Sequence, residues 1–218
     1  MGKLLLLPRE SNRRAGRPFG AGPSPPDNLP HGLVALIPIA IALIVTKDVL
    51  LGRASLVVSG ITDEPAHVVT ALLVVGALYV LLGRPITRGV VVGAICGGTL
   101  IDLDHIPLAL GRDWLTSETD RPITHSLLVL IPLLLVAVVL RGSRREVGLV
   151  TALALVSHFI EDMGDGTVPL LWPVMHHGVS LPYAAYLGML LVCTGVIVLR
   201  AVRGGPSFWD SGLFRPML

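Results

Sequence analysis

Six long apolar segments, separated by short polar connections, follow one another through the chain. They run over residues 33–51, 66–82, 87–101, 124–140, 147–161 and 181–199. Several fall short of the roughly 20 residues of an average membrane-spanning helix, the third and fifth most of all. Residues 56–61 are apolar but few, and we interpret them as part of a connection. The pattern predicts an all-α, polytopic membrane helix bundle of about six transmembrane helices, some of them short.

The composition agrees with a membrane protein. The 218 residues are 52% hydrophobic and only 15% charged, whereas soluble domains carry about 25% charged residues. Residues 1–30 are rich in Arg, Pro and Gly, carry a net charge of +3 and are predicted to form a disordered basic tail. We therefore expect this tail, a transmembrane domain at 31–203 that holds any metal site, and a C-terminal tail at 204–218.

The arginines and lysines indicate which way the bundle faces. With the N-terminus in the cytoplasm and six alternating helices, 13 basic residues lie on the inner side and 4 on the outer side. Cytoplasmic segments of membrane proteins carry such an excess. Both termini are therefore predicted to be cytoplasmic.

Four pairings of histidine with carboxylate interrupt the apolar pattern, at residues 63–67, 102–105, 120–125 and 158–162. The predicted topology places all four at the outer ends of helices, so their side chains are expected to meet at one depth. Each ionisable group costs roughly 2.5 kcal/mol or more at the centre of a membrane helix, and four such pairs therefore predict a metal site. Its predicted ligands are His67, Asp102, Asp104, His105, His125, His158 and Asp162.

Two of these pairings have a spacing that favours joint binding. Asp102 and His105 share a face if the helix continues, and the Gly-Gly pair at 97–98 allows another backbone to approach closely. His158 and Asp162 are four residues apart, the spacing that brings the two histidines of HExxH onto one zinc. Asp162 either binds the metal or orients the ring of His158.

The other two pairings are weaker when taken singly. His67 shares a helical face with residues 63–64, and Pro65 suits the first turn of a helix that opens there. His125 begins the fourth predicted helix, with Thr124 as its candidate cap. Each pairing also has a purely structural interpretation: an acidic helix cap beside a surface histidine, a solvated loop, or a buried histidine–carboxylate pair.

Several groups near the pairings have open roles. Arg121 either neutralises Asp120 or contacts an anionic group of a substrate. His176 and His177, in a predicted outer loop, are extra ligands, substrate contacts or neither. Trp172 suits the interfacial aromatic belt of a membrane protein.

The available donors indicate the metal and the chemistry. Cys96 and Cys193 both lie in apolar runs, which offers neither a disulfide framework nor a thiolate zinc motif. Imidazole with carboxylate favours Zn²⁺, with Mn²⁺ or Fe²⁺ as alternatives, and the inventory suffices for one or two ions. A divalent ion lowers the pKa of a bound water toward ~7, and either Glu64 or Asp104 would serve as general base.

The ordered motifs resemble the bacterial and archaeal family of membrane-bound metal-dependent hydrolases, the YdjM-like, LexA-regulated group. The matching elements are His67, Asp102-Leu103-Asp104-His105, Arg121-Pro122-Ile123-Thr124-His125-Ser126, Ser157-His158 with Asp162, and Gly166 with Trp172-Pro173. Ile101 replaces a proline of the family pattern, and Asp120 and Pro122 replace a histidine and a glycine. The resemblance covers about residues 60–175 and implies a metal-dependent hydrolase of a bacterial or archaeal cell membrane.

The sequence thus favours a membrane metallohydrolase with its site at the outer face, acting on a phosphoester or lipid-linked substrate. Its candidate catalytic residues are Glu64, Asp104 and Arg121. Membrane lipids and an unidentified small-molecule or lipid substrate are the expected partners, and no helix carries a basic, aromatic-interleaved face for nucleic acid. Two other classes stay open. One is a metal or proton transporter, disfavoured because the inner helix halves hold almost no ionisable groups; the other is a structural membrane protein with a structural metal.

Overall fold

The computed structural model describes residues 37–42, 44–46, 56–112, 119 and 121–203. Residues 37–42 and 44–46 are helical. The further elements are α2 (Leu56–Leu81), α3 (Arg88–Thr99), the 3₁₀ turn η1 (Leu100–Asp104), α4 (His105–Ala109), the 3₁₀ turn η2 (Leu127–Val129), α5 (Leu130–Val139), α6 (Gly142–Asp165) and α7 (Tyr183–Val202). The predicted all-α class is confirmed for the described part of the chain. The predicted tails at 1–30 and 204–218 lie outside it.

In the described part of the chain, four helices are long and apolar enough to cross a membrane. They are Asp63–Leu81, Arg88–Leu108, Gly142–Asp165 and Tyr183–Val202. The apolar helices at Ile37–Thr46 and Leu127–Val139 are shorter. The protein is therefore a membrane helix bundle, and a crossing by each of the two shorter segments stays a prediction.

The predicted helix boundaries were wrong in four of the elements. The third segment, predicted to be a short span at 87–101, continues through η1 and α4 to Leu108, and the fourth, predicted from Thr124, begins only after Ser126. Helix α2 begins at Leu56, so residues 56–61 belong to it, and Pro65 lies inside the helix rather than in its first turn. Helix α6 has 24 residues and is not a short span. In both helices, charged residues end the apolar run without ending the helix, because arginine and glutamate are themselves good helix formers.

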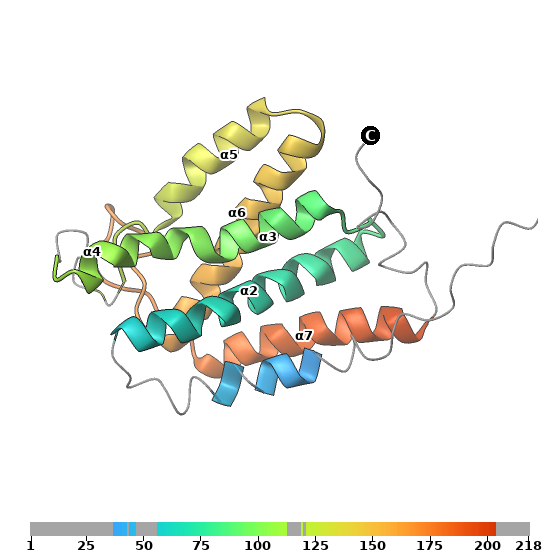
Figure 1. The fold of residues 1–218 in the computed structure, drawn as a ribbon, viewed down its shortest axis with the longest axis horizontal. Helices are drawn as coiled ribbons and strands as arrows, with labels where there is room; N and C mark the ends of the chain where they lie inside the picture. The colour runs from blue at the N-terminus through green and yellow to red at the C-terminus, as the bar shows by residue number, and fades with distance from the viewer. Residues whose placement is uncertain (1–36, 43, 47–55, 113–118, 120, 204–218) are drawn as a thin grey trace, which may run out of the picture.

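Helix α6 lies at the centre of the bundle, where it packs against α2, α3, α5 and α7. Figure 1 shows α2 and α3 side by side, α6 crossing them, and α7 along the far side of α2. Glycines permit the closest approaches. A Cβ on Gly97 would lie 2.2 Å from the Thr151 carbonyl oxygen of α6, and one on Gly98 would lie 3.0 Å from the His67 carbonyl oxygen of α2. The predicted close approach at this glycine pair is confirmed.

The bundle has two chemically different ends. One end, called the site end, lies at the left of Figure 1. There α3 continues into η1 and then α4, helices α5 and α7 begin, and α6 ends. The loop after α6 is fastened there, because Leu127 N–H donates to Leu170 O at 2.9 Å and Leu181 N–H to Met163 O at 2.7 Å. The opposite end, called the arginine end, carries Arg84, Arg88, Arg141, Arg144, Arg145, Arg200 and Arg203.

Candidate metal centre

All seven predicted ligand residues come together at the site end. Helix α2 contributes His67, η1 contributes Asp102 and Asp104, α4 begins with His105, and α6 contributes His158 and Asp162. His125 lies just before η2, in a turn closed by a hydrogen bond from its N–H to the Pro122 carbonyl oxygen at 2.9 Å. The predicted convergence of these side chains is therefore present in the structure.

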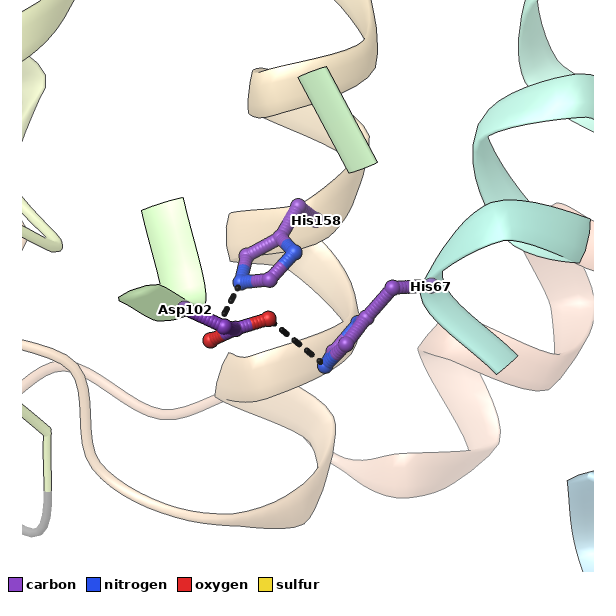
Figure 2. A group of neighbouring side chains, drawn as sticks. All are labelled: His67, Asp102 and His158. Carbon is purple, nitrogen blue, oxygen red and sulfur yellow. Dashed lines mark ion pairs between the residues drawn. The ribbon is translucent and has the colours of Figure 1, made fainter. Parts of the chain in front are cut away.

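Three histidine Nε2 atoms face the same two carboxylates. His158 Nε2 lies 3.2 Å from Asp162 and 3.5 Å from Asp102. His125 Nε2 lies 3.4 Å from Asp162 and 3.3 Å from Asp102, and His67 Nε2 lies 3.8 Å from each. Ligand atoms about 2.1 Å from a tetrahedral ion lie about 3.4 Å apart, so these separations suit a shared metal. Figure 2 shows Asp102 between His67 and His158, each from a different element.

The other ring nitrogen of each histidine meets an oxygen acceptor. His158 Nδ1 lies 3.0 Å from the Gly98 carbonyl oxygen, His67 Nδ1 lies 3.1 Å from Glu161 Oε2, and His125 Nδ1 lies 3.2 Å from Asp104 Oδ2. These acceptors favour the tautomer with a proton on Nδ1, which leaves the Nε2 lone pair facing the carboxylates. Metal-binding histidines are held in this way by a carboxylate or a backbone carbonyl.

Several inner atoms of the cluster are buried without hydrogen bonds to the described residues. His125, His158 and Asp162 are 0% exposed, and His67 is 2% exposed. His67 Nε2, His158 Nε2 and Asp102 Oδ2 make no hydrogen bond within the described part of the chain. Each unsatisfied buried polar atom costs about 1–3 kcal/mol. A divalent metal ion would satisfy them together, so this donor set fits such an ion.

The cluster is rich in carboxylates and holds one arginine in direct contact. Arg121 Nη2 lies 2.9 Å from Asp162 and 3.6 Å from Asp165. Burial alone would lower the pKa of Arg121, but the neighbouring carboxylates, Asp162 foremost, raise it. Burial would likewise lower the pKa of His125, and the carboxylates of Asp102 and Asp104 raise it. The centre therefore strongly favours positive charge.

A second set of contacts adjoins the first. His105 Nδ1 lies 3.0 Å from Asp104 Oδ1 and 3.3 Å from Asp102 Oδ1. Thr124 donates its hydroxyl hydrogen bond to Asp104 Oδ2. The prediction that Thr124 caps the next helix was wrong, because η2 begins after Ser126 and the Thr124 hydroxyl is drawn to Asp104 instead.

The remaining predicted residues are placed less centrally. Glu64 is half-buried on α2 and makes no hydrogen bond or ion pair with another described residue. His176 and His177 are exposed in the loop after α6, outside the groups that could hold a metal among the described residues. Trp172 lies half-buried in the same loop. Asp120 lies outside the described residues, so its pairing with Arg121 stays a prediction.

Sequence reasoning missed Glu161 as a site residue. It is 5% exposed on α6, and its carboxylate contacts His67 Nδ1 of α2. The signal was present, since a glutamate next to Asp162 on an apolar helix is costly unless it has a partner. The partner itself was not evident, because His67 lies on a helix far away in the sequence.

A family model described as YdjM inner membrane protein matches residues 63–211, more than half of the chain. The chain belongs to the YdjM inner membrane protein family. The resemblance to a YdjM-like family, inferred from the motifs, is thereby confirmed. The YdjM match includes every residue of the cluster, and together with the four apolar helices it supports a location in the membrane. No curated protein and no solved structure matches the chain.

Proposed function

We propose that the protein is a membrane metallohydrolase that cleaves a phosphoester or lipid-linked substrate, with Zn²⁺ as the first candidate ion. One observation carries the proposal. Three buried histidines present Nε2 to Asp102 and Asp162, while the Nδ1 of each lies 3.0 to 3.2 Å from a separate oxygen. A histidine–carboxylate pair that only stabilises the fold does not need three rings whose Nε2 atoms face the same two carboxylates.

The depth of the centre supports a substrate at headgroup level. His67 is four residues inside the start of the span Asp63–Leu81, and His158 is seven residues before the end of Gly142–Asp165. At about 1.5 Å per residue these positions lie roughly 6 and 10 Å inside the ends of the spans. The positive-inside rule would make the arginine end cytoplasmic and the site end the outer face.

The chain's own residues have separable roles in such a reaction. A divalent ion in this centre would act as a Lewis acid and activate a water as nucleophile. Glu64 would accept a proton from such a water as its oxygen bonds to phosphorus, and would return that proton to the leaving oxygen as the bond between this oxygen and phosphorus breaks. Glu64 suits this role better than Asp104, because Asp104 is engaged by His105, His125 and Thr124. Arg121 holds Asp162 in place.

The test is hydrolysis by the purified full-length protein in detergent, loaded separately with Zn²⁺, Mn²⁺ or Fe²⁺. Released phosphate and alcohol are measured with soluble phosphoesters and with diacylglycerol and polyprenyl phosphates. His158→Ala should abolish turnover and reduce metal content. Glu64→Gln should lower kcat at least about 100-fold, as expected for a lost general base, with metal content unchanged. His176→Ala, an exposed histidine, is the matched control.

Two results would contradict the proposal. One is the absence of hydrolysis with every ion and substrate class. The other is turnover by His158→Ala at the rate of the His176→Ala control.

A further inference from the structure

We infer that the centre binds two divalent ions and that the carboxylate of Asp102 is shared between them. The inference rests on the metal centre of the proposed function and deepens it. Its starting point is the number of donors. Seven side chains converge on the centre, whereas zinc in proteins is almost always held by about four ligands.

Among the described residues, His67 and His105 lie at the two sides of the cluster and do not contact each other, while His125 Nε2, 3.4 Å from Asp162, lies between the two sides. His67 Nε2 lies 3.8 Å from Asp102 and 3.8 Å from Asp162. His67 forms one group of candidate metal ligands with Asp102 and His158. On the other side, His105 Nδ1 contacts Asp104 at 3.0 Å and Asp102 at 3.3 Å. Two groups of donors result, one contributed mainly by α2 and α6 and the other by η1 and α4.

Asp102 is the carboxylate that both groups share. Its Oδ2 faces His67 Nε2 and makes no hydrogen bond. Its Oδ1 lies 3.3 Å from both His105 Nδ1 and His125 Nε2, and 3.5 Å from His158 Nε2. One carboxylate that contacts imidazoles of both groups through its two oxygens is placed to bridge two ions, as in two-metal hydrolytic sites.

His125 completes the second group. It is 0% exposed, and its Nε2 joins Asp102 and His105 in a set of donor atoms that all lie within 4.8 Å of one another. The first site then consists of His67, His158, Asp162 and one oxygen of Asp102. The second consists of Asp104, His105, His125 and the other oxygen of Asp102. Each ion receives four protein donors.

The charge of the cluster favours two ions over one. The carboxylates of Asp102, Asp104, Glu161 and Asp162 lie in contact with the four histidines. With Arg121 they carry −3 when the histidines are neutral. One divalent ion would leave the centre at −1 and would repel an anionic substrate. Two would leave these groups at +1, or at 0 when the ionised Glu64 of the proposed reaction is counted, so the centre would not repel a phosphoester.

The experiment uses Mn²⁺ as the probe with the full-length protein in detergent. Metal content is measured by mass spectrometry, and magnetic coupling by electron paramagnetic resonance. The wild-type protein should hold two Mn²⁺ per chain with an exchange-coupled spectrum. His105→Ala and, independently, Asp104→Asn should each hold one Mn²⁺ with an uncoupled spectrum. His67→Ala should also hold one, Asp102→Asn should lose the coupling, and the control His176→Ala should keep two coupled ions.

The outcomes separate this inference from the proposed function. One Mn²⁺ per chain in both the wild type and His105→Ala overturns the two-ion centre and leaves a one-metal hydrolase standing. Failure of Mn²⁺, Zn²⁺ and Fe²⁺ to bind overturns both. Two coupled ions without hydrolysis of any substrate support the two-ion centre and overturn the proposed function. Because Asp104→Asn and His105→Ala perturb the same site differently, a folding defect in one does not decide the result.

Discussion

The two ends of the bundle treat a carboxylate in opposite ways, half-buried at one end and buried at the other. At the arginine end, Glu146 Oε1 accepts a hydrogen bond from the Tyr79 hydroxyl at 2.9 Å and one from Arg84 Nη2 at 2.9 Å. The Arg84 guanidinium also lies over the Tyr79 ring, 5.5 Å from its centroid. The chain supplies both the donors and the positive charge that this carboxylate needs.

At the site end the donors and acceptors do not balance. Asp102 Oδ2, His67 Nε2 and His158 Nε2 are buried without hydrogen bonds in the described structure, and carboxylates outnumber the arginine that contacts them. The difference teaches that a polar cluster with matched partners stabilises the fold by itself, whereas one with surplus lone pairs depends on a bound cation. Perturbing each end separately tests this contrast.

The largest effect is expected from removing the metal. With free metal a thousandfold above its Kd, binding stabilises the folded protein by about 4 kcal/mol. A chelator should therefore lower the thermal unfolding temperature markedly, as followed by intrinsic fluorescence in detergent. The variant Tyr79→Phe is altered only at the arginine end, so the chelator should lower its thermal unfolding temperature by the same amount as in the wild type. Equal unfolding temperatures with and without chelator would remove the contrast between the ends.

A somewhat smaller effect is expected from Arg121→Met. Asp162, 0% exposed, would lose its arginine, and an uncompensated buried charge costs about 3 kcal/mol or more. The loss should appear in the metal-free protein and shrink when Mn²⁺ is added, since the ion replaces the missing charge. Arg145→Met, at an exposed arginine of the other end, is the control. If both variants unfold alike without metal, Arg121 does not hold Asp162.

Glu161→Gln should act through His67 rather than on the ion itself. Loss of the carboxylate behind a metal-binding histidine typically weakens metal affinity 10–100-fold, or about 2 kcal/mol. Titration with Mn²⁺ or Zn²⁺ should show this change while two ions still bind at saturation. The matched variant Glu146→Gln should leave the affinity unchanged. Equal affinities in the two variants would mean that the contact of Glu161 with His67 is only structural.

The smallest effect is expected from Tyr79→Phe. It removes one hydrogen bond to Glu146, and such a bond contributes about 1 kcal/mol to stability. The thermal unfolding temperature should fall by a few degrees, while metal content and any hydrolytic rate stay at wild-type values. A change in metal content would show that the two ends of the bundle are coupled, contrary to the contrast drawn above.

The parts of the site that were predictable depend on local spacing. His158 and Asp162 share one face of α6, and their contact at 3.2 Å follows from the four-residue interval. Asp102 and His105 contact each other because η1 carries the helical path onward into α4. The role of Pro65 was wrong because α2 continues through charged residues to an earlier start, and that of Thr124 because the next helical turn begins only after Ser126.

The contacts that were not predictable join residues from different helices. Arg121 meets Asp162, and Glu161 meets His67, only because α2 and the loop before η2 pack on α6. The depth at which α6 sits depends on Gly97, where a side chain would collide with the Thr151 backbone. A spacing rule within one helix carries no information about such a crossing.

The sequence by itself determined the apolar helices, the supply of imidazole and carboxylate donors, and their separation from most of the arginines. These properties depend on composition and on the spacing of residues within a single helix, because both are fixed by residues close together in the sequence. Only the tertiary structure decided which donors share a point, which carboxylates orient the histidines, and that Asp102 lies between two groups. Those relations depend on the register and crossing of packed helices, because a ligand must be placed to within a fraction of an ångström.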